Sequence, residues 1–352
     1  KNLEITTPGR ICLFGEHQDY LGLPVIAMGI SLRATISGYK RSDRQVIIHK
    51  PDLEETEIFS LDNLNYNKPR DYFKSAINVC SAEGLIFENG FECEIKSNIP
   101  IKAGTSSSSA ITVSWIHFLS YMTDKKVEWD KKKMADLAYR SEVIEFQEPG
   151  GMMDQYSTAI GNLVYIESEP KMHIQKLKSS LGSFVLGDSQ EPKETLMILK
   201  RCRDIRLELF NVIRLNNRDF NLHSSNVRLD LSDLNNEERA LLNATIKNRD
   251  ILRQAKIELI KTNPDHQLIG SLLNNHHYIL RDDLHVSTNK IERMLDAAMS
   301  AGAFGGKING SGGGGCMFAY APEDPEAVAK AIELAGGKSY IINADEGTKA
   351  LT

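Results

Sequence analysis

The chain has 352 residues, a formal net charge of −5, and 41% hydrophobic and 25% charged side chains, ordinary values for a folded soluble protein of two domains. No long run of Lys or Arg offers a nucleic-acid surface, no apolar run approaches the ~20 residues that span a bilayer, and the first ten residues lack a signal-peptide core. We therefore expect a cytoplasmic protein with neither a nucleic-acid nor a membrane partner.

The first half of the chain mixes predicted strands and helices. Alternation of apolar and polar residues predicts a hairpin over 31–49 and a strand over 91–96. Apolar residues at helical spacing predict helices in three segments: 71–82, 110–122 and 130–146. Two further strands are expected over 162–167 and 183–188.

After about residue 190 the sequence becomes more helical. Four charged segments with helical periodicity follow one another: 191–215, 235–261, 264–280 and 288–302. The chain then predicts a strand, a helix that ends at a glycine, and a last strand: 316–321, 323–337 and 338–344. We therefore divide an α/β protein into domains 1–188 and 189–352.

The five cysteines are widely spaced, and none forms a C-x-x-C pair. An odd, scattered set argues against a disulfide framework or a zinc site and for a reducing compartment. Cys12 and Cys316 lie among apolar and small residues, so we expect them to pack in the core.

A first polar cluster follows a short apolar strand near the N-terminus. Within Pro8–Tyr20 the polar residues are Arg10, Glu16, His17 and Asp19. Gly15 lets the chain turn sharply after the strand. Carboxylates and an imidazole on one rim suit the hydroxyl groups of a sugar. The alternative is a charged turn with local ion pairs.

A second cluster, Ile99–Ala110, combines Gly104 with the serines of 106–109 directly before an apolar helix. Free backbone N–H groups and the positive end of a helix dipole suit phosphate. It is not a Walker A loop, because no G-K-[ST] follows. The alternative is a flexible Ser-rich linker.

Two more segments carry chemistry. Lys307–Cys316 has five glycines in six residues, which would permit close approach of a ligand. The alternative is a loose connection between two elements. In Glu148–Tyr156 a glycine pair precedes Asp154, and Glu142 lies one predicted helix earlier. An Asp beside a basic group can act as a general base or orient a hydroxyl nucleophile, although most lone Asp residues are solvated or cap a helix.

The order and spacing of these four segments resemble those of the GHMP kinases, and within them galactokinase most. That resemblance implies an N-terminal ribosomal-protein-like α/β domain, a C-terminal ferredoxin-like α/β domain and an active site between them. It implies a monomeric or homodimeric enzyme that uses ATP and Mg²⁺ to phosphorylate a free sugar at its C1 hydroxyl group.

The resemblance also implies roles for individual residues. Asp154 would be the catalytic aspartate, with Arg10 beside it. Sugar hydroxyl groups would be bound by Glu16, His17 and Asp19. The ATP phosphates would be wrapped by Gly104, Ser106, Ser107, Ser108 and Ser109, and lined from the second domain by Gly312, Gly313 and Gly314. Magnesium would be bound by Ser108 and Glu142.

The chain departs from galactokinases at several positions. Galactokinases usually have other residues at Cys12, Gln18, Leu21 and Leu23, and segment 188–194 replaces the motif whose tyrosine touches the sugar. The glycine-rich segment is similar to that of mevalonate kinases, and residues 25–30 are similar to galacturonokinases. Galacturonate or another hexose, a mevalonate-type substrate, and a non-catalytic sugar sensor therefore stay open as alternatives.

Overall fold

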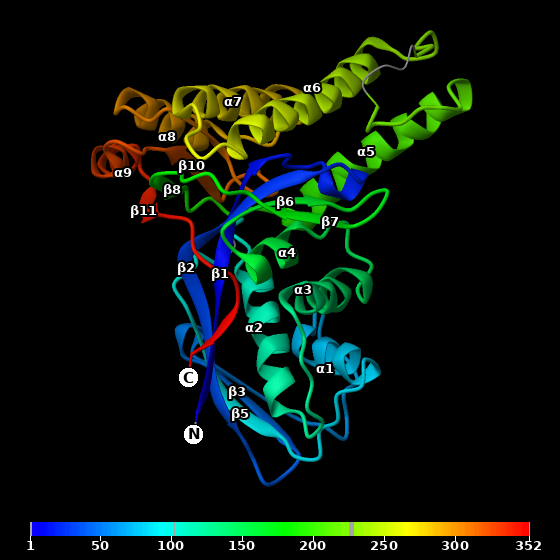
Figure 1. Cartoon of the computed structure of the whole chain (residues 1–352), viewed down its shortest axis with the longest axis vertical. Helices are drawn as coiled ribbons and strands as arrows, with labels where there is room; N and C mark the ends of the chain where they lie inside the picture. Colours follow the sequence, from blue (N-terminus) through cyan, green and yellow to red (C-terminus); the bar gives the residue numbers. More distant parts are fainter. Residues whose placement is uncertain (1, 102, 225–228, 352) are drawn as a thin grey trace.

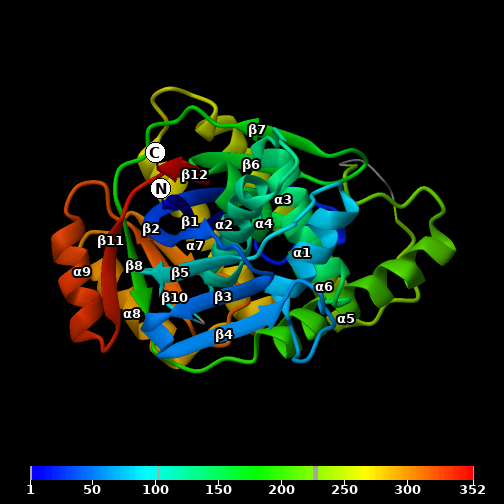
Figure 2. The same ribbon diagram turned by 90° about the horizontal axis from the view of Figure 1, so that it is seen from below.

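A computed structural model describes residues 2–101, 103–224 and 229–351, which form two β-sheets with helices packed against them (Figures 1 and 2). The first sheet has eight strands in the order β12-β1-β2-β5-β3-β4, with β6 paired to β2 and β7 to β6. Its strands are β1 (Leu3–Phe14), β2 (Val25–Lys40), β3 (Gln45–Lys50), β4 (Glu55–Ser60), β5 (Phe91–Ser97), β6 (Leu163–Glu167), β7 (His173–Lys176) and β12 (Lys349–Leu351).

The predicted hairpin over 31–49 is wrong, because β2 and β3 are not hydrogen-bonded to each other. Strand β5 lies between them, antiparallel to β2 through the Ile36–Ile95 pair and parallel to β3 through the Ile48–Cys93 pair. All four side chains are buried in one hydrophobic core. Alternation identifies a half-buried strand, whereas its partner depends on how a distant strand packs.

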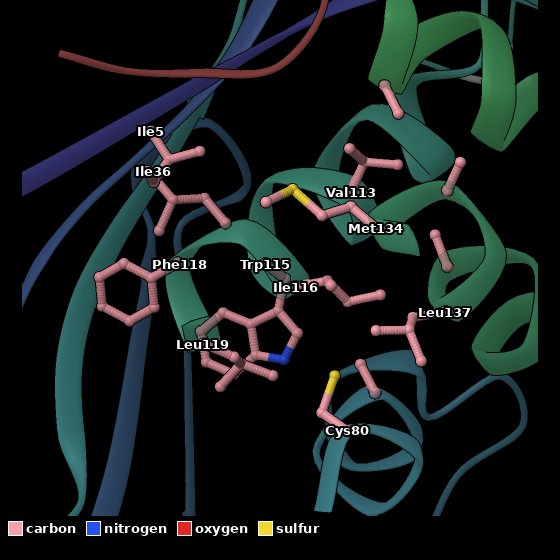
Figure 3. Packing of buried hydrophobic residues seen from close by; sticks show 14 of the residues in the cluster. Ile5, Ile36, Cys80, Val113, Trp115, Ile116, Phe118, Leu119, Met134 and Leu137 are labelled. Atoms are coloured by element: carbon pink, nitrogen blue, oxygen red, sulfur yellow. The ribbon is translucent and has the colours of Figure 1, made fainter. Parts of the chain in front are cut away.

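Four helices and one π-helical turn accompany the first sheet: α1 (Tyr72–Ala82), α2 (Ser107–Met122), α3 (Lys131–Tyr139), the turn Arg140–Ile144 and α4 (Met153–Ile160). Helix α2 is apolar on most sides because it contacts β1 and β2 on one side and α1, α3 and α4 on the other. Figure 3 shows its Trp115 and Phe118 side chains, whose rings pack 5.7 Å apart within this core. The helix predicted over 130–146 is α3 followed without a break by the π-helical turn, which ends at Ile144.

The second sheet has the antiparallel order β11-β8-β10-β9. Its strands are β8 (Phe184–Asp188), β9 (Gly305–Ile308), β10 (Cys316–Tyr320) and β11 (Lys338–Ile342). The helices are α5 (Thr195–Asn216), α6 (Asn236–Leu259), α7 (His266–Tyr278), α8 (Asn289–Ser300) and α9 (Pro325–Leu334), with a π-helical turn at Ile279–Asp283. A helical crossover between β8 and β9, a β9–β10 pair and α9 before β11 give the predicted ferredoxin-like pattern.

The chain changes sheets before β8 and returns to the first sheet at its end. Strand β8 pairs with β10 and β11, so the predicted division after residue 188 lies at the far end of a strand of the second sheet. Strand β12 pairs with β1 through Ile5 and Ala350, and the two termini lie near each other in both views (Figures 1 and 2). Local periodicity does not reveal which sheet a strand joins.

All five cysteines are buried and unpaired. Within the described ranges, no helix has both the length and the apolar character needed to cross a bilayer.

Candidate active site

A pocket of about 540 Å³ lies where elements from both sheets meet. Its walls include β1, the segment Gly104–Ser109 (the serine loop), the start of α4, the segment between β8 and α5, and the beginning of Gly310–Gly315 (the glycine loop). Every residue predicted for the site lines this pocket except three, Gly312, Gly313 and Gly314.

The glycine loop faces the pocket with Gly310 and Ser311, not with the glycines that follow. A Cβ atom added to Gly312 would lie 2.6 Å from the Val286 side chain, and one added to Gly313 would lie 2.3 Å from Ile198. These glycines have φ angles of +79° and +72° and pack against the second domain. A run of glycines carries no signal for which of them lines a pocket, so the sequence could not distinguish Gly310 from the glycines that follow Ser311.

Arg10 and Asp154 form an ion pair at the centre of the pocket. Arg10 Nε and Nη2 donate to Oδ1 of Asp154 at 2.9 and 2.7 Å, and Nη1 donates to the carbonyl of Gly104 at 2.5 Å. Burial lowers the pKa of Arg10, but the charges of Asp154 and Glu16 outweigh burial and raise that pKa. Since the pair uses only Oδ1, Oδ2 of Asp154 has no hydrogen-bond partner among the described residues.

The serine loop packs directly on β1, which explains how residues 94 positions apart meet. Arg10 N donates to Thr105 O at 3.1 Å, and a Cβ atom on Gly9 would lie 2.9 Å from that carbonyl oxygen. A larger residue at position 9 would therefore push the loop away from the strand.

One residue of the serine loop, Ser106, has a strained backbone conformation. Ser106 precedes α2 with a φ of +57°, and its buried Oγ atom has no hydrogen-bond partner within the described ranges. The left-handed conformation costs a non-glycine residue about 1–2 kcal/mol. The first N–H groups of α2 have no acceptor within the helix. An unsatisfied hydroxyl beside a helix N-terminus is a suitable arrangement for phosphate.

Glu142, on the π-helical turn, is held by the first turns of α2. It accepts hydrogen bonds from the hydroxyl groups of Ser108 at 2.9 Å, Ser109 at 2.7 Å and Thr112 at 3.0 Å. It also accepts one from Gln155 Nε2 at 2.6 Å. Burial raises the pKa of Glu142, and these hydrogen bonds partly offset the rise.

The predicted magnesium contacts Ser108 and Glu142 thus touch each other at the pocket wall. Oxygen ligands suit Mg²⁺, which proteins usually bind through one or two carboxylates together with substrate phosphates and water. In the described part of the chain, no three His, Cys, Asp or Glu side chains converge on a metal site. The residues therefore fit an ion that is bound jointly with nucleotide phosphates.

Asp19 lines the same pocket as Asp154. Its Oδ2 accepts a hydrogen bond from Met153 N at 3.3 Å, and it begins a short 3₁₀ turn, Asp19–Leu21. Burial, and then the charge of Asp154, raise the pKa of Asp19 to about 6. A Cβ atom on Gly151 would lie 2.0 Å from Oδ2, so only glycine leaves room for this carboxylate.

Glu16 has protein partners at one oxygen of its carboxylate. Lys307 Nζ donates to its Oε2 at 2.8 Å, and Gly310 N donates to the same atom at 2.9 Å. Both charged side chains are almost completely buried, with exposed fractions of 0% for Lys307 and 3% for Glu16. In this structure Glu16 therefore holds the glycine loop.

His17 also has protein partners for both ring nitrogens. Nε2 lies 2.9 Å from Ser311 O and Nδ1 lies 2.8 Å from Tyr20 Oη. Burial, followed by the charge of Arg206, lowers the pKa of His17 to about 3. The neutral ring must donate from Nε2 to the Ser311 carbonyl and accept at Nδ1 from Tyr20.

Several residues at this site have no recognisable signal in the sequence. Lys307 and Arg206 are single basic residues far along the chain from the His17 segment that they contact. Lys193 also lines the pocket. Its segment, 188–194, stands out in the sequence only because it replaces a galactokinase motif.

Three parts of the chain match known families. Residues 71–162 match the GHMP kinases N terminal domain, residues 256–338 match the GHMP kinases C terminal family, and residues 3–40 match the galactokinase galactose-binding signature.

Whole-chain relatives and solved structures agree with these matches. The mevalonate kinase of Thermococcus onnurineus is 30% identical over 98% of this chain and 97% of its own length. The galactokinase of Clostridium beijerinckii is 28% identical over 90% and 85%. The Lactococcus lactis galactokinase complexed with galactose covers 100% of this chain and 95% of its own, at a TM-score of 0.79 and 22% identity. The Methanococcus jannaschii mevalonate kinase covers 98% and 99%, at a TM-score of 0.74 and 21% identity. The chain therefore belongs to the GHMP kinases.

Proposed function

We propose that this GHMP kinase transfers the γ-phosphoryl group of ATP to the C1 hydroxyl group of a free sugar. The observation that carries the proposal is that the Arg10–Asp154 pair and Asp19 open onto the same pocket as the serine loop. One end of this pocket suits phosphates and the other suits hydroxyl donors.

Asp154 is the proposed acceptor for the sugar C1 hydroxyl proton. Its Oδ2 atom is available to accept the hydroxyl proton, while Arg10 holds Oδ1 and fixes the orientation of the carboxylate. Phosphoryl transfer needs positioning and charge stabilisation more than covalent chemistry, and the serine loop with the α2 N-terminus offers both to the phosphates. Bound Mg²⁺, contacted by Ser108 and Glu142, would offset phosphate charge.

The charge at the acceptor end favours a neutral sugar. Asp19 and Asp154 place two carboxylates there, and their mutual repulsion contributes to the raised pKa of Asp19. A carboxylate on the acceptor, as in a uronate or mevalonate, would be repelled by these two aspartates. Sugar hydroxyl groups, in contrast, can donate hydrogen bonds to both carboxylates. The match of residues 3–40 to the galactose-binding signature also supports a sugar.

A mevalonate-type acceptor is the second candidate. The alignment with the mevalonate kinase of Thermococcus onnurineus over almost the whole chain supports it. So does the use of both His17 ring nitrogens in contacts within the protein, because this side chain then offers little to a sugar.

The deciding experiment measures ADP formation with Mg²⁺ and ATP against D-galactose, D-galacturonate, D-mannose and mevalonate. We expect selective turnover of a neutral sugar, with the phosphate located on its C1 oxygen by NMR. Selective turnover of mevalonate would replace the sugar assignment with the second candidate. Binding of a sugar without ADP formation, in folded protein that binds ATP, would indicate a sensor.

A further inference from the structure

Lys193 is a partly buried cation of the pocket that the function above does not use. It lies between β8 and α5 and lines the pocket. Its Nζ donates to Ser311 Oγ at 3.2 Å. Within the described ranges, no carboxylate lies within ion-pair distance of this ammonium group, in contrast to Lys307, which is paired with Glu16.

The ammonium group of Lys193 lies between the two loops. A Cβ atom built on Gly104 of the serine loop would lie 2.7 Å from Nζ, and one built on Gly315 of the glycine loop would lie 3.3 Å from Lys193 Cδ. The carbonyl of the same Gly104 accepts the hydrogen bond from Arg10 Nη1. Two cationic side chains thus converge on one end of the serine loop.

Lys193 has no carboxylate as a hydrogen-bond partner among the described residues. Burial, and then the charge of Arg10, lower the pKa of Lys193. Arg10 has the Asp154 carboxylate as a partner, but Lys193 has only a neutral hydroxyl group. Partial burial of an ammonium group without a counter-ion is unfavourable, and an anion bound between the two loops would offset that cost.

We propose that Lys193 is a catalytic residue that contacts the γ-phosphoryl group of ATP during its transfer. The part of this proposal that concerns turnover rests on the proposed function, because it needs the sugar acceptor. The contact between Lys193 and the nucleotide is argued only from the geometry of the two loops. An acceptor carboxylate is the other anion that Lys193 could bind, but Asp154 and Asp19, the carboxylates proposed to meet the acceptor, make that position less favourable for a charged acceptor.

In the transfer step, the acceptor oxygen forms a bond to the γ-phosphorus while the bond from that phosphorus to the β–γ bridging oxygen breaks. The bridging oxygen leaves with the electron pair as part of ADP, and the acceptor hydroxyl proton passes to Asp154. Lys193 exchanges no proton. It donates hydrogen bonds to the non-bridging oxygens, where charge is spread in the transition state.

The test compares Lys193→Met and Lys193→Gln, which both remove the charge, with Lys200→Met as the matched control. Lys200 is exposed on α5, seven residues further along. Thermal unfolding first identifies the variants that fold. Calorimetry then measures the affinity of each folded variant for ATP and for ADP, with Mg²⁺ and without acceptor.

We expect the preference for ATP over ADP to fall about 10-fold or more in the Lys193 variants, since a hydrogen bond to a charged group contributes on this scale. With acceptor present, kcat should fall about 10²–10³-fold, as when one donor to a developing oxyanion is removed. The KM for the acceptor should stay near the wild-type value, and Lys200→Met should match wild type throughout.

An unchanged ATP-to-ADP affinity ratio in the folded Lys193 variants would overturn the proposal, even if the KM for the acceptor rises. If no sugar is phosphorylated by the wild type but its ATP preference still depends on Lys193, the sugar assignment fails and the phosphate contact of Lys193 is supported. The two failures are therefore distinguishable.

Discussion

Asp154 and Asp19 are neighbouring carboxylates whose surroundings differ. Asp154 is paired with the guanidinium group of Arg10, whereas Asp19 accepts from the backbone N–H of Met153. Burial and the nearby charge of Asp154 raise the pKa of Asp19 to about 6. The two carboxylates therefore lie in one pocket with different partners, which suits different roles.

Replacing the proposed base tests the first of these roles. Asp154→Asn keeps the size of the side chain but removes its capacity to accept a proton. We expect kcat to fall ~10²-fold or more and the affinity for ATP to stay near the wild-type value. Steady-state kinetics and nucleotide titration check both, with the exposed Asp296→Asn as control. Wild-type turnover in Asp154→Asn would remove Asp154 from the mechanism.

The raised pKa of Asp19 predicts a pH-dependent stability difference. In the unfolded chain an Asp has a pKa of about 3.9, whereas the folded protein holds the Asp19 proton up to about pH 6. Stability from this group is therefore present below the unfolded pKa and is lost as the pH rises through the folded pKa. Asp19→Asn, which cannot titrate, should gain stability relative to wild type as the pH rises from 4 to 7.

Thermal unfolding of the two proteins at several pH values across that range measures the difference. Other carboxylates titrate in both proteins, so their effects cancel to first order. A difference in Tm that stays constant between pH 4 and pH 7 would show that Asp19 has an ordinary pKa.

At the scale of elements, the π-helical turn after α3 determines where Glu142 points. The turn Arg140–Ile144 follows α3 without a break and places Glu142 against the first turns of α2. Such turns inside helical segments often occur at functional sites. The helical periodicity of 130–146 could not reveal the extra residue in the turn, because a π-helical turn has the composition of a helix.

Glu142→Gln tests whether this contact serves a metal ion. The amide keeps the shape but loses the charge, so we expect the Mg²⁺ concentration for half-maximal rate to rise about 10-fold or more. The exposed Glu145→Gln, one residue past the same turn, is the matched control. Equal Mg²⁺ dependence in both variants and wild type would exclude Glu142 from the metal site.

At the scale of the whole molecule, buried polar contacts join the two sheets around the pocket. Lys307 of β9 donates to Glu16 and to the carbonyl of Cys12. Asn309 accepts from Cys12 N at 2.9 Å and donates to Gly104 O at 2.8 Å. These contacts, together with the hydrophobic core that β1 shares with the second sheet, hold the walls of the pocket in place.

Lys307→Met should therefore destabilise the protein strongly. Removing one member of a buried ion pair leaves the other charge uncompensated and costs about 3–5 kcal/mol. Lys349→Met breaks the surface pair with Glu346 and should cost about 0–1 kcal/mol. Urea unfolding measures both free energies.

The double variant Glu16→Gln with Lys307→Met removes both charges of the buried ion pair. It should be more stable than Lys307→Met alone, because no buried charge is left unpaired. Equal losses for Lys307→Met and Lys349→Met would show that the buried pair contributes no more than a surface pair.

The sequence by itself determined the features that depend on neighbouring residues. Helical spacing located the helices that became α1, α2 and α5 to α9 within a few residues. The serine run before an apolar helix identified the serine loop, because residues at a helix N-terminus are adjacent in sequence. The four polar segments together also indicated the family. These signals are local, and local conformational preferences are enough to produce them.

Tertiary structure decided the rest. It placed β5 between β2 and β3, returned β12 to the first sheet, and engaged Glu16 with Lys307. It also brought Lys193 beside the serine loop. Each of these contacts joins residues far apart in the chain, and its energy depends on burial and on the groups around it. A single basic residue looks the same in sequence whether it is solvated or buried, so only the packed fold could distinguish the two.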